Sequence, residues 1–153
     1  MTATIRKLKQ KLSESDGGFS FAEIIASLAI MLILSSAVGF SALKYIDRAR
    51  HTAAVTQMSA FRNALQTYYL DCGTYPTGEQ GLSALWEKPY LSPVPSGWNG
   101  PYTESEIGKD PWGNDYIYKS PGSNSLPFEI ISYGSDGKEG GEGNAADIIS
   151  WKK

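Results

Sequence analysis

The chain has 153 residues and a formal net charge of −2, with 14 basic and 16 acidic side chains and one cysteine. An acidic chain whose Lys and Arg residues are scattered lacks the basic surface that binds nucleic acid. A single cysteine excludes an intramolecular disulfide and a zinc site built from several thiolates. Once a leader and a membrane segment are set aside, the length leaves one small domain.

The N-terminal segment is the most informative part of the chain. Four basic residues precede Gly17-Gly18, and residues 24–43 contain no charged side chain. Twenty helical residues span about 30 Å, the thickness of the hydrocarbon core of a bilayer. We therefore predict a basic leader in residues 1–18 and a membrane-spanning half of a long helix in residues 19–43.

One carboxylate, Glu23, stands directly before this apolar run. A carboxylate at such a place is costly and usually has a partner or a task. The junction Gly18-Phe19, followed four residues later by Glu23, resembles a class III signal, which a prepilin peptidase would cleave after Gly18. The new amine of Phe19 would lie one helical turn from Glu23. Proteins with such signals assemble into filaments, and the resemblance implies that this amine pairs with Glu23 of a neighbouring, staggered subunit.

Two other interpretations of the N-terminal segment stay open. A conventional secretory signal has an apolar core of about 7–15 residues and a small-residue cleavage site, which Ala37-Val38-Gly39 resembles. The run here is longer, and it begins after Glu23, where such signals favour positive charge. A plain signal anchor is the other interpretation, because basic residues on both sides of the span leave its orientation undecided.

The long helix is predicted to continue beyond the membrane segment. Residues 19–70 contain no proline and only one glycine, Gly39, which permits one helix of about fifty residues. In its second half, apolar residues recur at spacings of three and four along one stripe: Ala54, Met58, Phe61, Leu65 and Tyr68. We expect this stripe to pack against the chain's own domain, residues 44–153. The helix should end near Asp71-Cys72-Gly73.

Shorter elements follow the long helix. The segment Thr77-Gly78-Glu79-Gln80 fits a capping box, and a short helix carrying Leu82, Leu85 and Trp86 should follow it and end before Pro89. Residues 89–113 are rich in Pro, Gly and Asn and predict an extended loop.

Three strands complete the predicted elements. They lie at residues 116–118, 128–133 and 148–151, and residues 128–133 alternate in the manner of a strand with two distinct faces. A glycine-dense loop separates the second strand from the third. The predicted fold class is α+β, with a long N-terminal helix packed on a small antiparallel sheet.

No catalytic constellation is present. His51, the only histidine, precedes Cys72 by twenty-one residues on the same predicted helix, or about 30 Å, which excludes a Cys–His pair. The chain also lacks a nucleophile elbow, a phosphate-binding glycine loop and a zinc-protease motif. We therefore expect no enzymatic activity, and we expect Cys72 to pack as a small apolar side chain.

Several blocks of the second half carry a family resemblance. They are Tyr75-Pro76-Thr77-Gly78-Glu79-Gln80-Gly81-Leu82, Asp110-Pro111-Trp112-Gly113-Asn114, and the closing Gly134-Ser135-Asp136-Gly137 and Asp147-Ile148. In this order, and over essentially all of residues 17–151, the chain resembles the major pseudopilins of type II secretion systems, in the type IV pilin-like superfamily. The resemblance implies a pilin-like fold anchored once in the inner membrane of a Gram-negative bacterium, with residues 44–153 in the periplasm. It also implies polymerisation into a periplasmic pseudopilus that drives folded exoproteins through an outer-membrane secretin.

The resemblance further implies partners and a metal. The partners are other copies of the chain, the prepilin peptidase, the inner-membrane assembly platform and the minor pseudopilins, and the amine of Phe19 would be methylated. The family's equivalent of the loop from residue 134 to 147 folds over calcium. Carried over by position, the ligands are the carboxylates of Asp136 and Asp147 and the carbonyls of Tyr133 and Lys138. Glu142 or Asn144 is a further candidate oxygen ligand.

Some alternatives remain beside this resemblance. By composition alone, the loop with its five glycines and four carboxylates favours a solvated turn that binds no ion, and only the resemblance favours calcium. A type IV pilin or minor pseudopilin is a second possibility, and a signal-anchored periplasmic calcium-binding module that never polymerises is a third. The chain also departs from the family, since residues 38–41 lack the usual proline and Ala22 replaces a larger apolar residue.

Overall fold

The computed structural model describes residues 18–151, apart from the side chains of residues 37–42. The predicted leader therefore lies outside the described residues except for Gly18, and so does the side-chain environment of the proline-free segment around Gly39. The chain divides into two compact units, Met1–Lys44 and Tyr45–Lys153.

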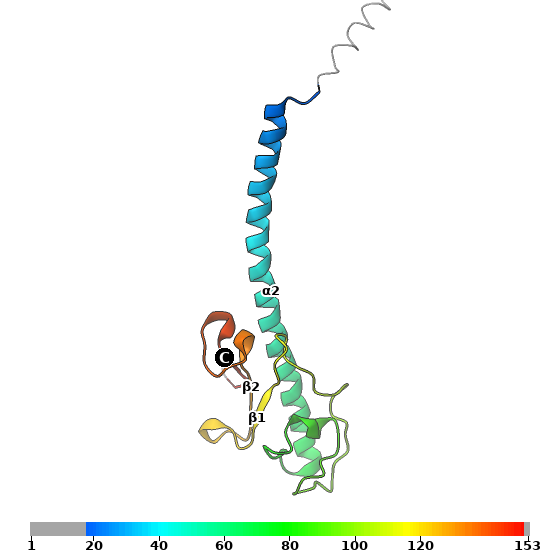
Figure 1. Ribbon diagram of the computed structural model, residues 1–153. Coiled ribbons are helices and arrows are strands. Elements are labelled where there is room, and N and C mark those ends of the chain that lie inside the picture. Colours follow the sequence, from blue (N-terminus) through cyan, green and yellow to red (C-terminus); the bar gives the residue numbers. More distant parts are fainter. Residues whose placement is uncertain (1–17, 152–153) are drawn as a thin grey trace, which may run out of the picture. The chain divides into compact units, whose positions relative to one another are not determined.

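The prediction of one long helix is confirmed. Helix α2 (Phe21–Cys72) runs without interruption, starting two residues later than the predicted Phe19 and ending at the predicted place (Figure 1). Gly73 follows it with φ +73°, a left-handed conformation that commonly ends helices and that glycine adopts without a Cβ clash. In the part of the chain that the structure describes, no helical segment combines the length and hydropathy of a membrane span.

Three short strands form one antiparallel sheet in the order β1-β2-β3. They are β1 (Ile117–Lys119), β2 (Glu129–Ser132) and β3 (Ile148–Ile149), each close to its predicted place and the last two shorter than predicted. Ile131 of β2 pairs with Ile117 on one side and with Ile149 on the other.

Both faces of the central strand are buried, although alternation along the sequence distinguishes two faces. All four residues of β2 are buried. Glu129 on one face accepts a hydrogen bond from the Ser123 hydroxyl, and Ser132 on the other donates one to Asp110. Ile130 belongs to the core cluster together with residues of α2, whereas Glu129 and Ser132 meet Ser123 and Asp110, which lie outside the sheet. The alternating pattern of a strand does not encode these partners.

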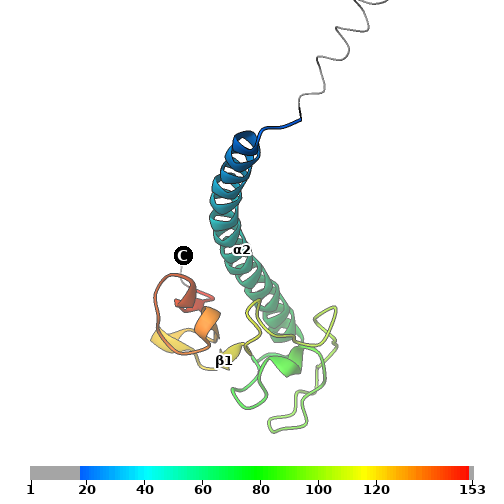
Figure 2. The same ribbon diagram turned by 45° about the horizontal axis from the view of Figure 1, so that its top comes forward.

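The core of the second unit lies between the C-terminal part of α2 and the sheet. In both views, β1 lies beside this part of the helix (Figures 1 and 2). The predicted stripe is confirmed, with Phe61 half-buried and its other members fully buried. The remaining buried apolar residues come mainly from the 3₁₀ turn η1 (Leu82–Leu85) and from the sheet and the residue before β2: Leu82, Leu85, Phe128, Ile130 and Ile148. Cys72 is half-buried and packs against this core, as predicted.

The predicted short helix is a single 3₁₀ turn, η1 (Leu82–Leu85), and the predicted capping box forms just before it. The Thr77 amide donates to Gln80 Oε1 at 3.0 Å, and the Gln80 amide donates to Thr77 Oγ1 at 3.2 Å. The residue that caps η1 is nevertheless Gly81, so the box closes the preceding turn. The Gln80 side chain also donates to the carbonyls of Leu91 and Pro93, which ties down the long loop.

Aromatic side chains attach the loop of residues 89–113 to the domain. Trp98 Nε1 donates to the Ala84 carbonyl at 2.9 Å, and the Tyr102 hydroxyl donates to Asp71 Oδ2 at the same distance.

A further tyrosine joins the sheet to the segment after α2. Tyr118 of β1 donates to the Pro76 carbonyl, and burial raises the pKa of its hydroxyl to about 12. The hydroxyl therefore remains a donor across the neutral range.

We expect Leu65→Ala to destabilise the protein, because Leu65 is 0% exposed in the centre of the core. Its loss should leave a cavity and lower the free energy of unfolding by about 2–5 kcal/mol. Leu70→Ala is the matched control, since this leucine on the same helix is 80% exposed. It should change stability by less than about 0.5 kcal/mol. Urea titration of both full-length variants in detergent micelles checks this, and equal transition midpoints would contradict the assigned core.

Candidate functional site

The first candidate site is the start of α2, where Ser20 and Glu23 form a reciprocal cap. The Ser20 amide donates to Glu23 Oε2 at 2.8 Å, and the Glu23 amide donates to Ser20 Oγ at 3.3 Å. This is the capping box of the pattern Ser-x-x-Glu, which satisfies two backbone donors that the first helical turn leaves free. The separation of three residues between Ser20 and Glu23 is the sequence signal for this cap.

The predicted cleavage site lies immediately before this cap. Gly18, Phe19 and Ser20 precede the helix, and all three are exposed. A Cβ built on Gly18 meets nothing within 4 Å among the described residues. Among the described residues, no other segment covers Gly18 or Phe19.

The first helical turns expose a continuous set of large apolar side chains. Every residue from 18 to 36 is exposed. The large apolar members are Phe19, Phe21, Ile24, Ile25, Leu28, Ile30, Met31, Leu32, Ile33 and Leu34. Contiguous apolar surface of this kind marks contact with a membrane or with another protein.

The second candidate site is the C-terminal loop, where two 3₁₀ turns pack against each other. They are η3 (Gly134–Asp136) and η4 (Gly143–Ala145). A Cβ on Gly134 would lie 2.8 Å from the Asn144 carbonyl oxygen and 3.0 Å from that of Ala146, so only glycine permits this approach. Gly134, at the start of the loop, therefore packs against Ala146, the residue before Asp147.

Both carboxylates predicted as ligands also hold the loop backbone. Asp136 Oδ1 accepts from the Lys138 amide at 3.1 Å, and Asp147 Oδ2 accepts from the Gly140 amide at 3.0 Å. The other predicted ligands, the carbonyls of Tyr133 and Lys138, belong to the same loop. The additional candidates Glu142 and Asn144 have exposed side chains.

The second oxygen of Asp147 fits a metal ligand. Among the described residues, Asp147 Oδ1 is buried and has no hydrogen-bond partner. A buried carboxylate oxygen without a partner is costly, and a bound cation is one way to satisfy it. Within the same described part, no group of three His, Cys, Asp or Glu side chains gathers. A cation here would therefore need backbone carbonyls, which calcium accepts readily.

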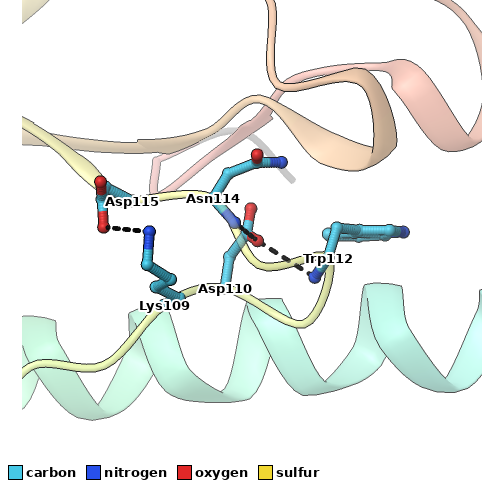
Figure 3. A network of polar contacts seen from close by, with 5 residues as sticks. All are labelled: Lys109, Asp110, Trp112, Asn114 and Asp115. Carbon is cyan, nitrogen blue, oxygen red and sulfur yellow. Dashed lines mark hydrogen bonds and ion pairs between the residues drawn. The ribbon is translucent and has the colours of Figure 1, made fainter.

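A third arrangement, the turn of residues 109–115, lies beside this loop and was singled out in the sequence only as a family block. Asp110 is 4% exposed, and its Oδ1 accepts from the amides of Trp112 at 3.0 Å and Asn114 at 2.8 Å (Figure 3). The Asp110 amide donates to the Asn114 carbonyl. At the surface, Lys109 and Asp115 form an exposed ion pair at 3.2 Å.

The chain is similar to proteins of one family. The family model of the type II secretion system (T2SS), protein G, matches residues 41–151. The type II secretion system core protein G of Pseudomonas aeruginosa is 41% identical over 88% of this chain and 94% of its own. That of Vibrio cholerae is 42% identical, covering 88% and 90% of the two chains.

A solved structure gives the same result for the fold. The crystal structure of the major pseudopilin from the type 2 secretion system of enterohaemorrhagic Escherichia coli aligns with a TM-score of 0.61 and 35% identity. The alignment covers 71% of this chain and 92% of that one. The predicted α+β, pilin-like fold is thereby confirmed. The chain belongs to the protein G family of the type II secretion system.

Proposed function

We propose that this chain is a major pseudopilin, a structural subunit that polymerises into the periplasmic pseudopilus of a type II secretion system. The filament would drive folded exoproteins through the outer-membrane secretin. The observation that carries this proposal is the apolar, exposed start of α2 with its capped Glu23, in a chain of the protein G family. A structural role also accords with the lack of a catalytic motif in the sequence.

We infer that residues 19–43 hold the subunit in the inner membrane before assembly. The exposed apolar side chains of the first helical turns support this, because water would leave them unfavourably solvated. Residues 44–153 would then lie in the periplasm of a Gram-negative bacterium. The partners that follow are the prepilin peptidase, the inner-membrane assembly platform, the minor pseudopilins and neighbouring copies of the chain.

We also propose that the loop from residue 134 to 147 binds calcium. The carboxylates of Asp136 and Asp147 and the carbonyls of Tyr133 and Lys138 would hold the ion, and the unpartnered Asp147 Oδ1 supports this set. When bound, calcium would supply a hard cation that joins the two ends of a glycine-rich loop. The function of the loop would be structural, since a folded C-terminus presents a defined surface to neighbouring subunits.

Cleavage between Gly18 and Phe19 tests the proposed processing. Mass spectrometry of the protein recovered from membranes should find Phe19 as the N-terminal residue, with its amine methylated. We expect Gly18→Val to block cleavage, because a protease that approaches the backbone closely needs glycine there. Gly17→Ala, one residue earlier, should still be cleaved. Recovery of wild-type protein that retains Met1, or that begins near Phe40, would contradict the proposal.

A further inference from the structure

The buried turn around Asp110 is joined to the proposed calcium loop by hydrogen bonds at Gly134. The Gly134 amide donates to Ser132 Oγ at 3.3 Å. The Gly134 carbonyl accepts from Asn114 Nδ2 at 2.8 Å. Both peptide bonds of Gly134 are therefore held by side chains that lie outside the loop.

The hydrogen bond from Ser132 to Asp110 decides that Ser132 acts as the acceptor for the Gly134 amide. Ser132 is 0% exposed, and its hydroxyl donates to Asp110 Oδ2 at 2.6 Å. Because the hydroxyl proton points to the carboxylate, only the lone pairs of Ser132 Oγ remain to receive the Gly134 amide. The other oxygen, Asp110 Oδ1, is occupied by two amides of its own turn (Figure 3).

Because the peptide bond is planar, the hydrogen bond of the Gly134 amide also orients the Tyr133 carbonyl, which is a proposed calcium ligand. In a trans peptide, the carbonyl of one residue and the N–H of the next lie in one plane and point in opposite directions. When the Gly134 N–H is held on Ser132, the direction of the Tyr133 carbonyl is fixed as well. Asn114 likewise fixes the peptide that follows Gly134, two residues before Asp136.

The loop also closes around the Asn114 side chain. Gly137 has φ +65°, and a Cβ built on it would lie 2.8 Å from Asn114 Oδ1. Asn114 is therefore hydrogen-bonded to Gly134 and packed against Gly137, on either side of Asp136. The amide side chain acts as a template for the segment that bears one of the two carboxylates.

We propose that Asn114, together with the Asp110–Ser132 pair, positions the loop for calcium before the ion arrives. This inference rests on the proposed calcium site. A loop that is already ordered loses less conformational freedom on binding, so its affinity is higher. Outer partners that orient metal ligands typically contribute about 10–100-fold in affinity. Asn114 does not touch the ion, and its role is to aim the Tyr133 carbonyl and the Asp136 carboxylate.

The test is calorimetric titration of the full-length protein in detergent micelles with calcium chloride. Asn114→Ala should raise the Kd by about 10-fold or more. Asn114→Leu, which has a similar volume but no hydrogen-bond donor and no charge, should weaken binding about as much. Lys109→Ala is the matched control, because it breaks the exposed ion pair of the same turn without touching the loop. It should bind like the wild type.

A second measurement separates positioning from general destabilisation. Thermal unfolding in chelator measures the stability of each variant without calcium. The Kd measures the affinity of the folded protein for calcium, which depends on how well the loop is ordered before binding. A merely structural role would lower the midpoint in chelator and leave the Kd of the folded protein unchanged. A wild-type Kd in both Asn114 variants would overturn the inference while the calcium site stands. Failure of the wild type to bind calcium would overturn both.

Discussion

Replacing Glu23 with glutamine should abolish assembly and secretion while leaving the helix start intact. Glutamine can still accept the Ser20 amide, because a capping box tolerates Glu or Gln at this position. Only the negative charge is lost. After cleavage, the positive amine of Phe19 in one subunit would lack its partner on the next. A charge left uncompensated in an apolar filament core strongly disfavours the assembled state.

Ser20→Ala is the complementary control, since it removes the hydroxyl that receives the Glu23 amide but keeps the carboxylate. We expect this variant to assemble and to support secretion. Each variant should be expressed in cells that lack the wild-type copy, and secreted enzyme should be measured in the medium. Amine-reactive cross-linking of membranes then shows whether regular multiples of the subunit form.

The outcomes distinguish charge pairing from capping. If Glu23→Gln is processed and inserted but gives no ladder, whereas Ser20→Ala gives one, the carboxylate acts through its charge. Normal secretion by Glu23→Gln would reject the pairing role. Loss of assembly in Ser20→Ala with retention in Glu23→Gln would instead assign the site to helix capping alone.

Removing calcium should lower the thermal unfolding midpoint of the wild-type protein, and Asp147→Ala should abolish that difference. A ligand that binds only the folded state adds RT ln(1 + [L]/Kd), about 2.7 kcal/mol at a hundredfold excess over Kd. In a domain of this size, 1 kcal/mol shifts the midpoint by roughly 4–8 °C, so the expected shift is about 10 °C or more.

The buried oxygen of Asp147 sharpens this prediction. In chelator, Asp147→Ala removes an unpartnered buried carboxylate oxygen, which is favourable, and the hydrogen bond from the Gly140 amide to the other oxygen, which is unfavourable, so the two effects oppose each other. The variant should therefore lose its calcium response while its midpoint in chelator stays close to that of the wild type. Glu139→Ala is the matched control, because this exposed carboxylate of the same loop is not a proposed ligand. It should keep the full calcium shift, and an unchanged shift in Asp147→Ala would show that the loop binds no ion there.

Local features of the molecule follow from the sequence because they depend on neighbouring residues. The absence of proline from α2 and the left-handed Gly73 after it determine one long helix. The spacing of Ala54, Met58, Leu65 and Tyr68 determines which helix face is buried. Both capping boxes, Thr77 with Gln80 and Ser20 with Glu23, depend on a separation of three residues, although only the first was predicted.

Only the tertiary structure decided the contacts between distant parts of the chain. Asp110 meets Ser132 across 22 residues, and Asn114 meets Gly134 across 20, because the path of the chain places the turn beside the end of β2. The burial of β2 on both faces has the same origin, since the core shared with α2 covers Ile130 and the segment around Ser123 meets Glu129. The spacing of apolar residues in the sequence identifies which face of a helix or strand is apolar. Which segment covers that face depends on how the helices, strands and loops pack in three dimensions.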